Sequence, residues 1–396
     1  MSPRVLILSW EYPPIIEGGL ARHVSKLSEA LVRDGVEVHV LTRGERETPS
    51  EQTRAGVHIH RVAEEQAPRD LDAFLAWVEG MNSHLHAAGR RLGKRIEFDL
   101  VHGHDWLVAG AAAGLAQRLR LPYLTTIHAT EYGRHQGWVD KHPQSYIHGI
   151  ETWMAGRAER VITCSHYMRG QVADVYELAE ERVTVIPNGI DTADLHPVAD
   201  LDELRSRFAK PGERLVLLVG RLVYEKGFQL ALDALPGVIR RAGRVRFLVA
   251  GSGPYEAQLH KQARTLGLMR HGTFLGWIGD DVLHSLYPIA DLCVVPSLYE
   301  PFGLVALEAM ASGCPCVVAD TGGLREIVPE DERVGLRFNG GDAEHLAIMI
   351  ERLLTDPELC DRLVAEASEH VLGFDWGDVA ARTAALYDDA LAGVRG

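Results

Sequence analysis

The chain has 396 residues, of which 46% are hydrophobic and 24% charged, as in folded proteins of two or three domains. Asp and Glu outnumber Lys and Arg by 55 to 41, a net charge of −14. This acidity excludes a general nucleic-acid-binding role, because such binding depends on neutralising phosphates. Five scattered cysteines are too few for a disulfide framework.

The sequence contains no visible targeting or membrane-spanning segment. The first apolar run, ending at Trp10, is short and has no small-residue cleavage site after it. Nowhere do 18 apolar residues follow one another. We therefore expect a cytoplasmic protein with free thiols and no integral membrane segment.

Short apolar strands alternate with amphipathic helices along the chain, as in Arg22–Arg33 and Phe228–Ala242. The predicted strands in the first half are Val5–Ser9, Val36–Leu41, Val57–Val62, Leu100–His104, Tyr123–Ile127, Val161–Cys164 and Val183–Ile186. Those in the second half are Leu215–Gly220, Arg246–Ala250, Thr273–Leu275, Leu292–Pro296, Pro315–Ala319 and Gly335–Phe338. Alternation of this kind predicts α/β architecture with doubly wound, parallel sheets.

The strand series is too long for one open sheet, and it pauses in a polar, Pro-containing stretch that ends near Arg214. We place a hinge at Pro187–Leu195 and predict two Rossmann-like domains, 1–190 and 191–376. The carboxyl ends of both sheets are expected to face one cleft, where open α/β sheets bind their ligands.

Two glycines, Gly18 and Gly19, come just before the first predicted helix. Backbone N–H groups at a helix start suit an anion. The alternative is a tight loop that needs glycine for its dihedral angles.

Two cations flank the corresponding turn of the second domain. Arg221 follows a buried-type strand, and Lys226 precedes the next helix. Together they could neutralise a diphosphate as charge builds on a leaving group. The alternative is that the two cations lie in a solvated loop, or that one of them pairs with Glu225, without binding a ligand.

The stretch from Ser297 to Gly313 carries two carboxylates, Glu300 and Glu308, around a helix expected to start near Phe302–Gly303, with Pro301 in its first turn. Glu300 is expected beside the N–H groups of Gly303 and Leu304. Glu308 lies in an otherwise apolar helix, so it needs a partner such as a ribose diol. The alternative is a structural carboxylate bonded to backbone or to an arginine.

His128 follows a first-domain strand at the carboxyl end of the sheet, a position that favours a site residue over a surface histidine. His102 and His104 also follow a strand, but no third partner at convincing spacing completes a metal site. The glycines of Gly251–Pro254 match only half of a dinucleotide-binding pattern.

Taken together, these motifs resemble retaining glycosyltransferase family four, which has the two-domain GT-B fold. The matching segments are Glu11–Gly19, His102–Trp106, Thr126–Glu131, Pro187–Asp191, Gly220–Gly227, Gly251–Pro254 and Glu300–Glu308. They cover nearly the whole chain in the family's order. The opening segment, and the one around His128, are most similar to bacterial glycogen-synthase-type α-glucosyltransferases.

The resemblance implies roles for the second-domain residues. Arg221 and Lys226 would hold the donor diphosphate, Glu308 the nucleotide ribose and Glu300 the sugar hydroxyls. The amides of three consecutive residues would orient sugar and phosphate: Phe302, Gly303 and Leu304.

In the first domain, the resemblance places Gly18 and Gly19 near the phosphate and His128 over the donor sugar. It also implies that the chain crosses back at Phe374–Trp376, so that a helix over Val379–Ala392, within 377–396, joins the first domain.

The implied reaction transfers a hexose, glucose, from UDP- or ADP-glucose to an α-1,4-glucan or related glycan with retention of configuration. No cofactor and no metal are expected: no Asp-x-Asp pair follows a second-domain strand, since Asp280 and Asp281 are adjacent and Asp320 stands alone. Alternatives are a mannosyltransferase, a sugar-nucleotide epimerase on the same fold, a nicotinamide-dependent oxidoreductase and a catalytically silent carbohydrate-binding protein. Gly18-Gly19 does not fit the oxidoreductase pattern.

Overall fold

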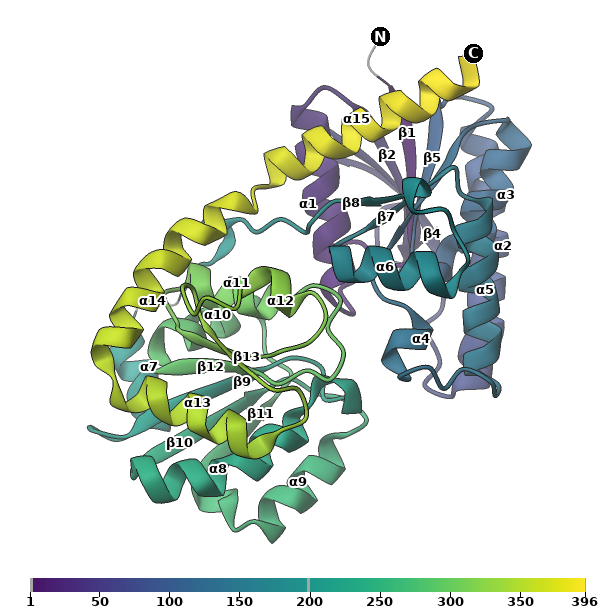
Figure 1. Cartoon of the computed structure of the whole chain (residues 1–396). Coiled ribbons are helices and arrows are strands. Elements are labelled where there is room, and N and C mark those ends of the chain that lie inside the picture. Colours follow the sequence, from purple (N-terminus) through teal and green to yellow (C-terminus); the bar gives the residue numbers. More distant parts are fainter. Residues whose placement is uncertain (1–2, 198–199, 396) are drawn as a thin grey trace. The chain divides into compact units, whose positions relative to one another are not determined.

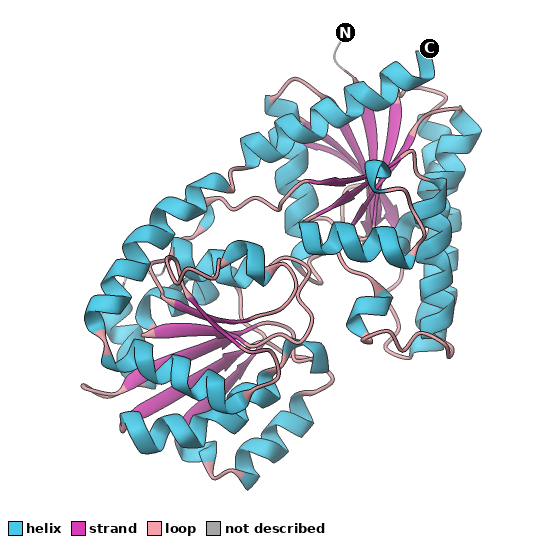
Figure 2. Ribbon diagram, in the orientation of Figure 1, coloured by secondary structure: helices cyan, strands magenta, loops and turns pink. Residues whose placement is uncertain are grey.

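The computed structural model describes residues 3–197 and 200–395. The chain forms two compact units, one comprising Met1–Gly189 with Trp376–Gly396 and the other Ile190–Asp375. In each unit helices pack on a central sheet (Figures 1 and 2). Among the described residues, none of the helices has both the length and the apolar character that a membrane crossing requires.

The sheet of the first unit has the strand order β3-β4-β2-β1-β5-β6-β7-β8, and only the β3–β4 pairing is antiparallel. Its strands are β1 (Arg4–Ser9), β2 (Glu37–Gly44), β3 (Glu51–Arg54), β4 (Val57–Ala63), β5 (Leu100–His104), β6 (Tyr123–Ile127), β7 (Arg160–Thr163) and β8 (Val183–Val185). The central strands β1, β5 and β6 are buried on both faces along almost their whole length, as the sequence predicted, although β5 and β6 also carry polar residues. The polar edge strand β3, whose four residues are all exposed, was not predicted.

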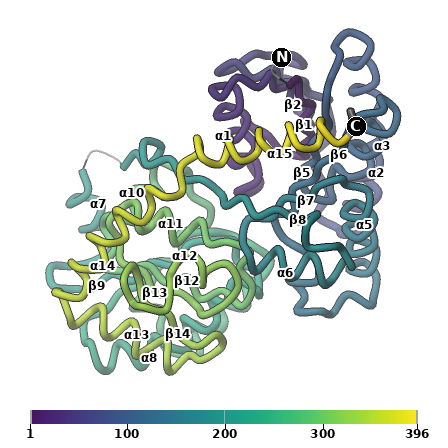
Figure 3. The backbone as a smooth tube through the Cα atoms, turned by 45° about the horizontal axis from the view of Figure 1, so that its top comes forward, coloured from purple at the N-terminus to yellow at the C-terminus, as the bar shows by residue number. Residues whose placement is uncertain are grey.

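The helices of the first unit are α1 (Gly19–Arg33), α2 (Leu71–Leu92), α3 (Ala109–Leu119), α4 (Glu131–Arg134), α5 (Gln144–Arg157), α6 (His166–Val175) and α15 (Trp376–Arg395). Helices α1 and α15 cover one face of the sheet, and α2, α3 and α5 lie along the other (Figure 1). The return of α15 confirms the predicted crossing of the chain (Figure 3). Trp376, Val379 and Tyr387 of α15 join a core with Val24, Leu27 and strand residues.

The second unit has a wholly parallel sheet of order β11-β10-β9-β12-β13-β14. Its strands are β9 (Arg214–Val219), β10 (Val245–Ala250), β11 (Gly272–Gly276), β12 (Leu292–Val295), β13 (Cys316–Ala319) and β14 (Leu336–Phe338). Its helices are α7 (Leu201–Phe208), α8 (Phe228–Ala242), α9 (Glu256–Thr265), α10 (Asp280–Ile289), α11 (Leu304–Ala311), α12 (Leu324–Ile327), α13 (Ala343–Thr355) and α14 (Pro357–His370). The order reverses at β9 and β12, so the loops after these strands meet at a topological switch point.

Helix α11 begins at Leu304 with Gly303 as its N-cap, one residue after the predicted start near Phe302–Gly303, and Pro301 lies in the preceding loop and not in the first turn as predicted. Gly303 has φ +126°, which is incompatible with a helix. The N–H of Gly323 donates to the carbonyl of Glu300 at 2.9 Å, which ties the loop before α11 to the loop after β13.

Candidate functional site

The loop after β9, which carries Arg221, is held by close backbone contact with the loop after β10. A Cβ on Gly251 would lie only 1.9 Å from the carbonyl oxygen of Gly220, so only glycine permits this approach. The N–H of Leu222 donates to the carbonyl of Ser252 at 2.9 Å. The exposed Arg221 side chain therefore starts from a rigid backbone at the carboxyl edge of the sheet.

Lys226 is brought to the loop after β12 by Gly227. This glycine has φ +70°, and a Cβ on it would lie 1.9 Å from the carbonyl oxygen of Pro296. As a result, Lys226 Nζ donates to Glu300 Oε2 at 2.7 Å, and Ser297 Oγ donates to the same oxygen at 2.9 Å.

The Lys226–Glu300 pair joins two residues predicted from separate motifs. Both side chains are largely covered, with 24% and 12% of their surfaces exposed. The alternative pairing with Glu225 is not the contact that Lys226 makes; the backbone carbonyl of Glu225 accepts from the N–H of Leu298 at 2.8 Å. This geometry places a cation and a carboxylate together where the two central strands end.

Glu308 lies on α11 and accepts a hydrogen bond of 2.7 Å from the hydroxyl of Tyr287 on α10. Tyr287 is fully buried, and burial with the neighbouring Glu308 charge raises the pKa of its phenol far above the usual value. The hydroxyl thus remains a donor and orients the carboxylate. Tyr287 is a partner that the sequence argument did not name.

The start of α11 presents the predicted amide donors. Phe302 is buried and its ring lies 6.0 Å from that of Phe374, Gly303 caps the helix, and Leu304 is the first helical residue. Among the described residues, the Glu300 carboxylate accepts no hydrogen bond from Gly303 or Leu304. Lys226 and Ser297 bind that carboxylate instead.

In the first unit, the start of α1 is already bound by a carboxylate of the chain. Glu11 Oε2 accepts from the N–H groups of Glu17 and, at 3.2 Å, Gly18, while Oε1 accepts from Ala21 at 3.3 Å. The expectation that Gly18 offers a free amide to an anion is therefore wrong. The alternative, a tight loop that needs glycine for its dihedral angles, does not hold for Gly18 either, because its φ of −169° is an ordinary extended value. Burial raises the pKa of Glu11 to about 7 despite these donors.

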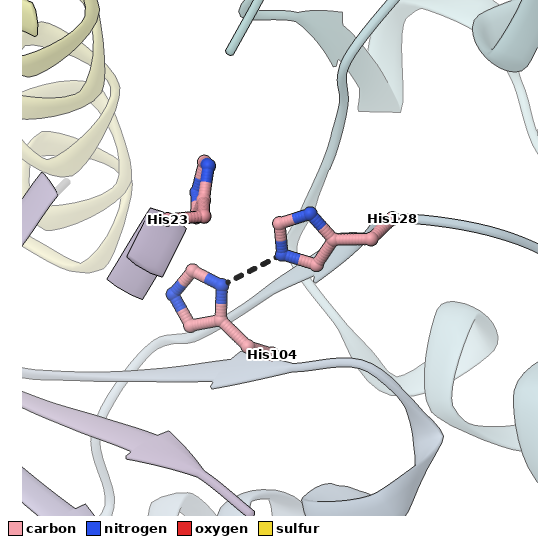
Figure 4. Close-up of side chains that lie close together, drawn as sticks. All are labelled: His23, His104 and His128. Carbon is pink, nitrogen blue, oxygen red and sulfur yellow. Dashed lines mark hydrogen bonds between the residues drawn. The ribbon is translucent and has the colours of Figure 1, made fainter. Parts of the chain in front are cut away.

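His128 lies directly after β6 in a group of imidazoles that includes His104, at the end of β5, and His23 of α1 (Figure 4). His104 Nδ1 and His128 Nε2 are 3.1 Å apart and share a hydrogen bond. The ring of His23 meets that of His128 edge-on, with centroids 4.5 Å apart. Burial lowers the pKa of all three, that of His128 to about 3, so the rings are neutral at pH 7.

Asp105, which follows His104, is a site residue that the sequence argument did not select. Its φ is +61°, a strained value for a non-glycine residue. Its Oδ1 accepts from the backbone N–H of His128 at 2.8 Å, and burial raises its pKa to about 6. The signal available was its position, one residue beyond a buried strand. By contrast, His102 is satisfied within the core by Tyr387 and Thr126.

Two α/β units, each built on a mainly parallel sheet, are the architecture of GT-B glycosyltransferases. Here the second sheet also carries charged residues at its carboxyl edge. Two family models match consecutive parts of the chain: Glycosyltransferase Family 4 over residues 17–194, and Glycosyl transferases group 1 over residues 200–370. The chain belongs to this glycosyltransferase family, and the predicted GT-B fold is confirmed.

Curated relatives cover the full length. A glycogen synthase of Mycobacterium tuberculosis is 38% identical over 99% of this chain and 96% of its own. An uncharacterised glycosyltransferase of Methanocaldococcus jannaschii is 34% identical over 98% of both chains. The protein is thus a glycogen-synthase-like glycosyltransferase.

Solved structures show the same fold. Sucrose-phosphate synthase from Thermosynechococcus elongatus superposes with a TM-score of 0.84 at 26% identity, over 99% of this chain and 100% of that one. Anabaena HepE in complex with UDP-glucose has a TM-score of 0.76 at 21% identity, covering 98% and 99%. The catalytic domain of Arabidopsis thaliana starch synthase IV, bound to ADP and acarbose, has a TM-score of 0.80 at 20% identity, covering 99% and 100%.

Proposed function

We propose that the protein is a retaining glucosyltransferase that moves glucose from UDP- or ADP-glucose to an α-1,4-glucan or a related glycan acceptor. The observation that carries the proposal is the contact of Lys226 with Glu300 at the switch point of the second unit. Full-length similarity to a glycogen synthase favours glucose over mannose. Related folds bound to UDP-glucose or to ADP support a nucleotide-sugar donor.

Arg221 and Lys226 would bind the donor diphosphate. Lys226 needs no large movement for this role, because Glu300, itself held by Ser297, already fixes its ammonium group. A phosphate oxygen would share the ammonium with Glu300, whose other oxygen would accept from sugar hydroxyls. The guanidinium of Arg221 adds a permanent charge that can contact two oxygens at once.

Glu308 would accept from the ribose diol while Tyr287 holds its Oε2. The amides of Phe302, Gly303 and Leu304 would orient sugar and phosphate. Gly19 would approach the phosphate from the first unit. For Gly18 the same role requires displacement of Glu11, whose carboxylate accepts from that amide.

In the transfer itself, the bond between the anomeric carbon and the diphosphate oxygen breaks as the acceptor oxygen bonds to the same face of that carbon. The acceptor proton passes to the departing diphosphate. His128 would lie beside the reacting carbon, and as a neutral imidazole it can bind a sugar hydroxyl without repelling positive charge developing on the ring. Glu300 positions the sugar and forms no bond to it.

We further propose that transfer needs no divalent metal and no cofactor, because the two cations supply the charge that stabilises the leaving group. A cytoplasmic setting agrees with the five cysteines, which are all free thiols.

The deciding experiment incubates the protein with UDP-, ADP- and GDP-activated glucose and mannose, with and without maltooligosaccharide, in excess EDTA. Elongation of the oligosaccharide from a glucose donor is the expected result. Transfer of mannose alone would make the protein a mannosyltransferase. Conversion of the donor sugar without any acceptor would indicate an epimerase and refute the proposal.

A further inference from the structure

We propose that His23, His104 and His128 form an inhibitory binding site for a transition-metal ion, represented by Zn²⁺. The three rings come from α1 and from the ends of β5 and β6, and they converge in Figure 4. One nitrogen from each lies within 4.8 Å of the others. This site is separate from the catalytic metal that many glycosyltransferases use, because the metal here would oppose transfer.

The distances are close to those of a tetrahedral zinc site. With Zn–N bonds of 2.0–2.1 Å, two nitrogens bound to one ion lie about 3.3 Å apart. His104 Nδ1 and His128 Nε2 are already 3.1 Å apart. All three ligand nitrogens lie within 4.8 Å of one another, so no pair exceeds the ideal separation by more than about 1.5 Å. A rotation of the His23 side chain covers such a distance.

The protonation state of the cluster also suits a metal. Neutral imidazole is the form that binds Zn²⁺, and burial keeps all three rings neutral. When the ion replaces the shared hydrogen bond, the proton between His104 and His128 moves to a nitrogen that faces away from the ion. No net proton is released, and both rings remain neutral.

Two buried nitrogens lack hydrogen bonds. Nε2 of His104 and Nδ1 of His23 are inaccessible to solvent and have no partner at bonding geometry, although the side chain of Asn188 lies beside His23. Both residues are more than nine-tenths buried. Unsatisfied buried polar atoms cost stability, and ligation through Nδ1 of His23 would recover that cost at this residue.

A second group, Glu37, His39 and His58, has suitable ligand atoms but already pairs with a cation. Ring orientation does not distinguish the two groups, because His39 and His58 are stacked at 20°, as are His104 and His128. Glu37 Oε1 is taken by Arg4 at 2.6 Å, and this hydrogen bond lowers the pKa of Glu37 to about 2. The neighbouring guanidinium would also repel a cation. This group provides the matched control.

Binding would inhibit transfer because coordination removes His128 from the donor sugar. This consequence rests on the proposed function, whereas metal binding can be measured without it. Inhibition is expected from Zn²⁺ but not from Mg²⁺, which prefers oxygen ligands, and EDTA should reverse it.

The test uses EDTA-treated, dialysed full-length protein. Calorimetry should show one tight Zn²⁺ site per chain, and Co²⁺ should give the visible absorption of a tetrahedral site. His23→Gln should weaken Zn²⁺ binding by more than the roughly 10–100-fold that loss of an outer-shell partner costs, whereas His58→Gln should leave it unchanged. Thermal unfolding checks that each variant folds. If His23→Gln does not fold, His104→Gln is used in its place.

The outcomes separate the claims. Absence of tight Zn²⁺ binding, or loss of binding in His58→Gln but not in His23→Gln, refutes the site. Tight binding with undiminished transfer refutes the inhibitory role. A protein that transfers no sugar under any condition contradicts the proposed function, and calorimetry still decides whether the metal site exists.

Discussion

Substitution of Gly227 by alanine tests whether the close approach of two loops builds the donor site. The new Cβ would lie 1.9 Å from the carbonyl oxygen of Pro296 and 2.7 Å from its carbon, where real contacts exceed 3.0 Å. One of the loops must move. Lys226, the preceding residue, then loses its 2.7 Å contact with Glu300.

The expected loss in the free energy of unfolding has two parts. The left-handed backbone at φ +70° costs an alanine about 1–2 kcal/mol. Overpacking against a rigid backbone adds about 1–3 kcal/mol. The sum of roughly 2–5 kcal/mol lowers the melting temperature by roughly 4–20 °C for a unit of this size. Gly267→Ala is the matched control, since φ is +71° there but nothing lies within 4 Å of the new Cβ.

The assay compares thermal unfolding and donor turnover in the two variants. Gly267→Ala should lose only the backbone part, about 1–2 kcal/mol, and keep its turnover. Gly227→Ala should be less stable and much slower. Equal stability of the two variants, with turnover preserved in both, would refute the reasoning.

Three further predictions concern single side chains. Lys226→Ala should lower turnover by roughly 10²–10³-fold, as loss of one oxyanion donor does, and a rate near wild type would contradict its role at the leaving group. Glu308→Gln should weaken nucleotide binding in calorimetry, whereas Glu300→Gln should mainly slow sugar transfer; unchanged nucleotide affinity in Glu308→Gln would remove the ribose role. Glu151 is buried, and burial raises its pKa from 4.5 to about 7. The folded state then keeps a proton that the unfolded state releases, so this contribution to stability is complete below pH 4.5 and is lost as pH rises through 7. Between pH 5 and pH 8, the free energy of unfolding should fall by about 3 kcal/mol less in Glu151→Gln than in the wild type. Denaturant unfolding at the two pH values measures this fall, and an equal fall in both proteins would contradict the prediction.

The strands were predictable wherever burial on both faces requires a continuous apolar run. Leu292–Val295 is such a run, and the predicted strand, Leu292–Pro296, exceeds it by one residue. Strand β3 was missed because an edge strand with four exposed residues carries no apolar pattern. The polar helix α7 was missed for the same reason, since it has no buried residue.

The candidate site was predictable as a set of residues but not as a set of contacts. Arg221, Lys226 and Glu300 each follow a strand of one parallel sheet, which is enough to place them at one edge. Pairing depends on side-chain direction, so the bond from Tyr287 to Glu308 could not be foreseen. The hydrogen bond from the Gly18 amide to Glu11 likewise depends on the path of a loop, and the sequence of that loop has no periodic pattern.

Helix α15 has a consequence for the order in which the chain can fold during synthesis. The second unit, Ile190–Asp375, is continuous in sequence and is translated as a whole. The first unit lacks Trp376, Val379 and Tyr387 of its core until the last segment leaves the ribosome. The bond between His102 and Tyr387 spans 285 residues. A nascent chain therefore carries an open apolar face on α1 for most of its synthesis, a stage at which chaperones are needed most.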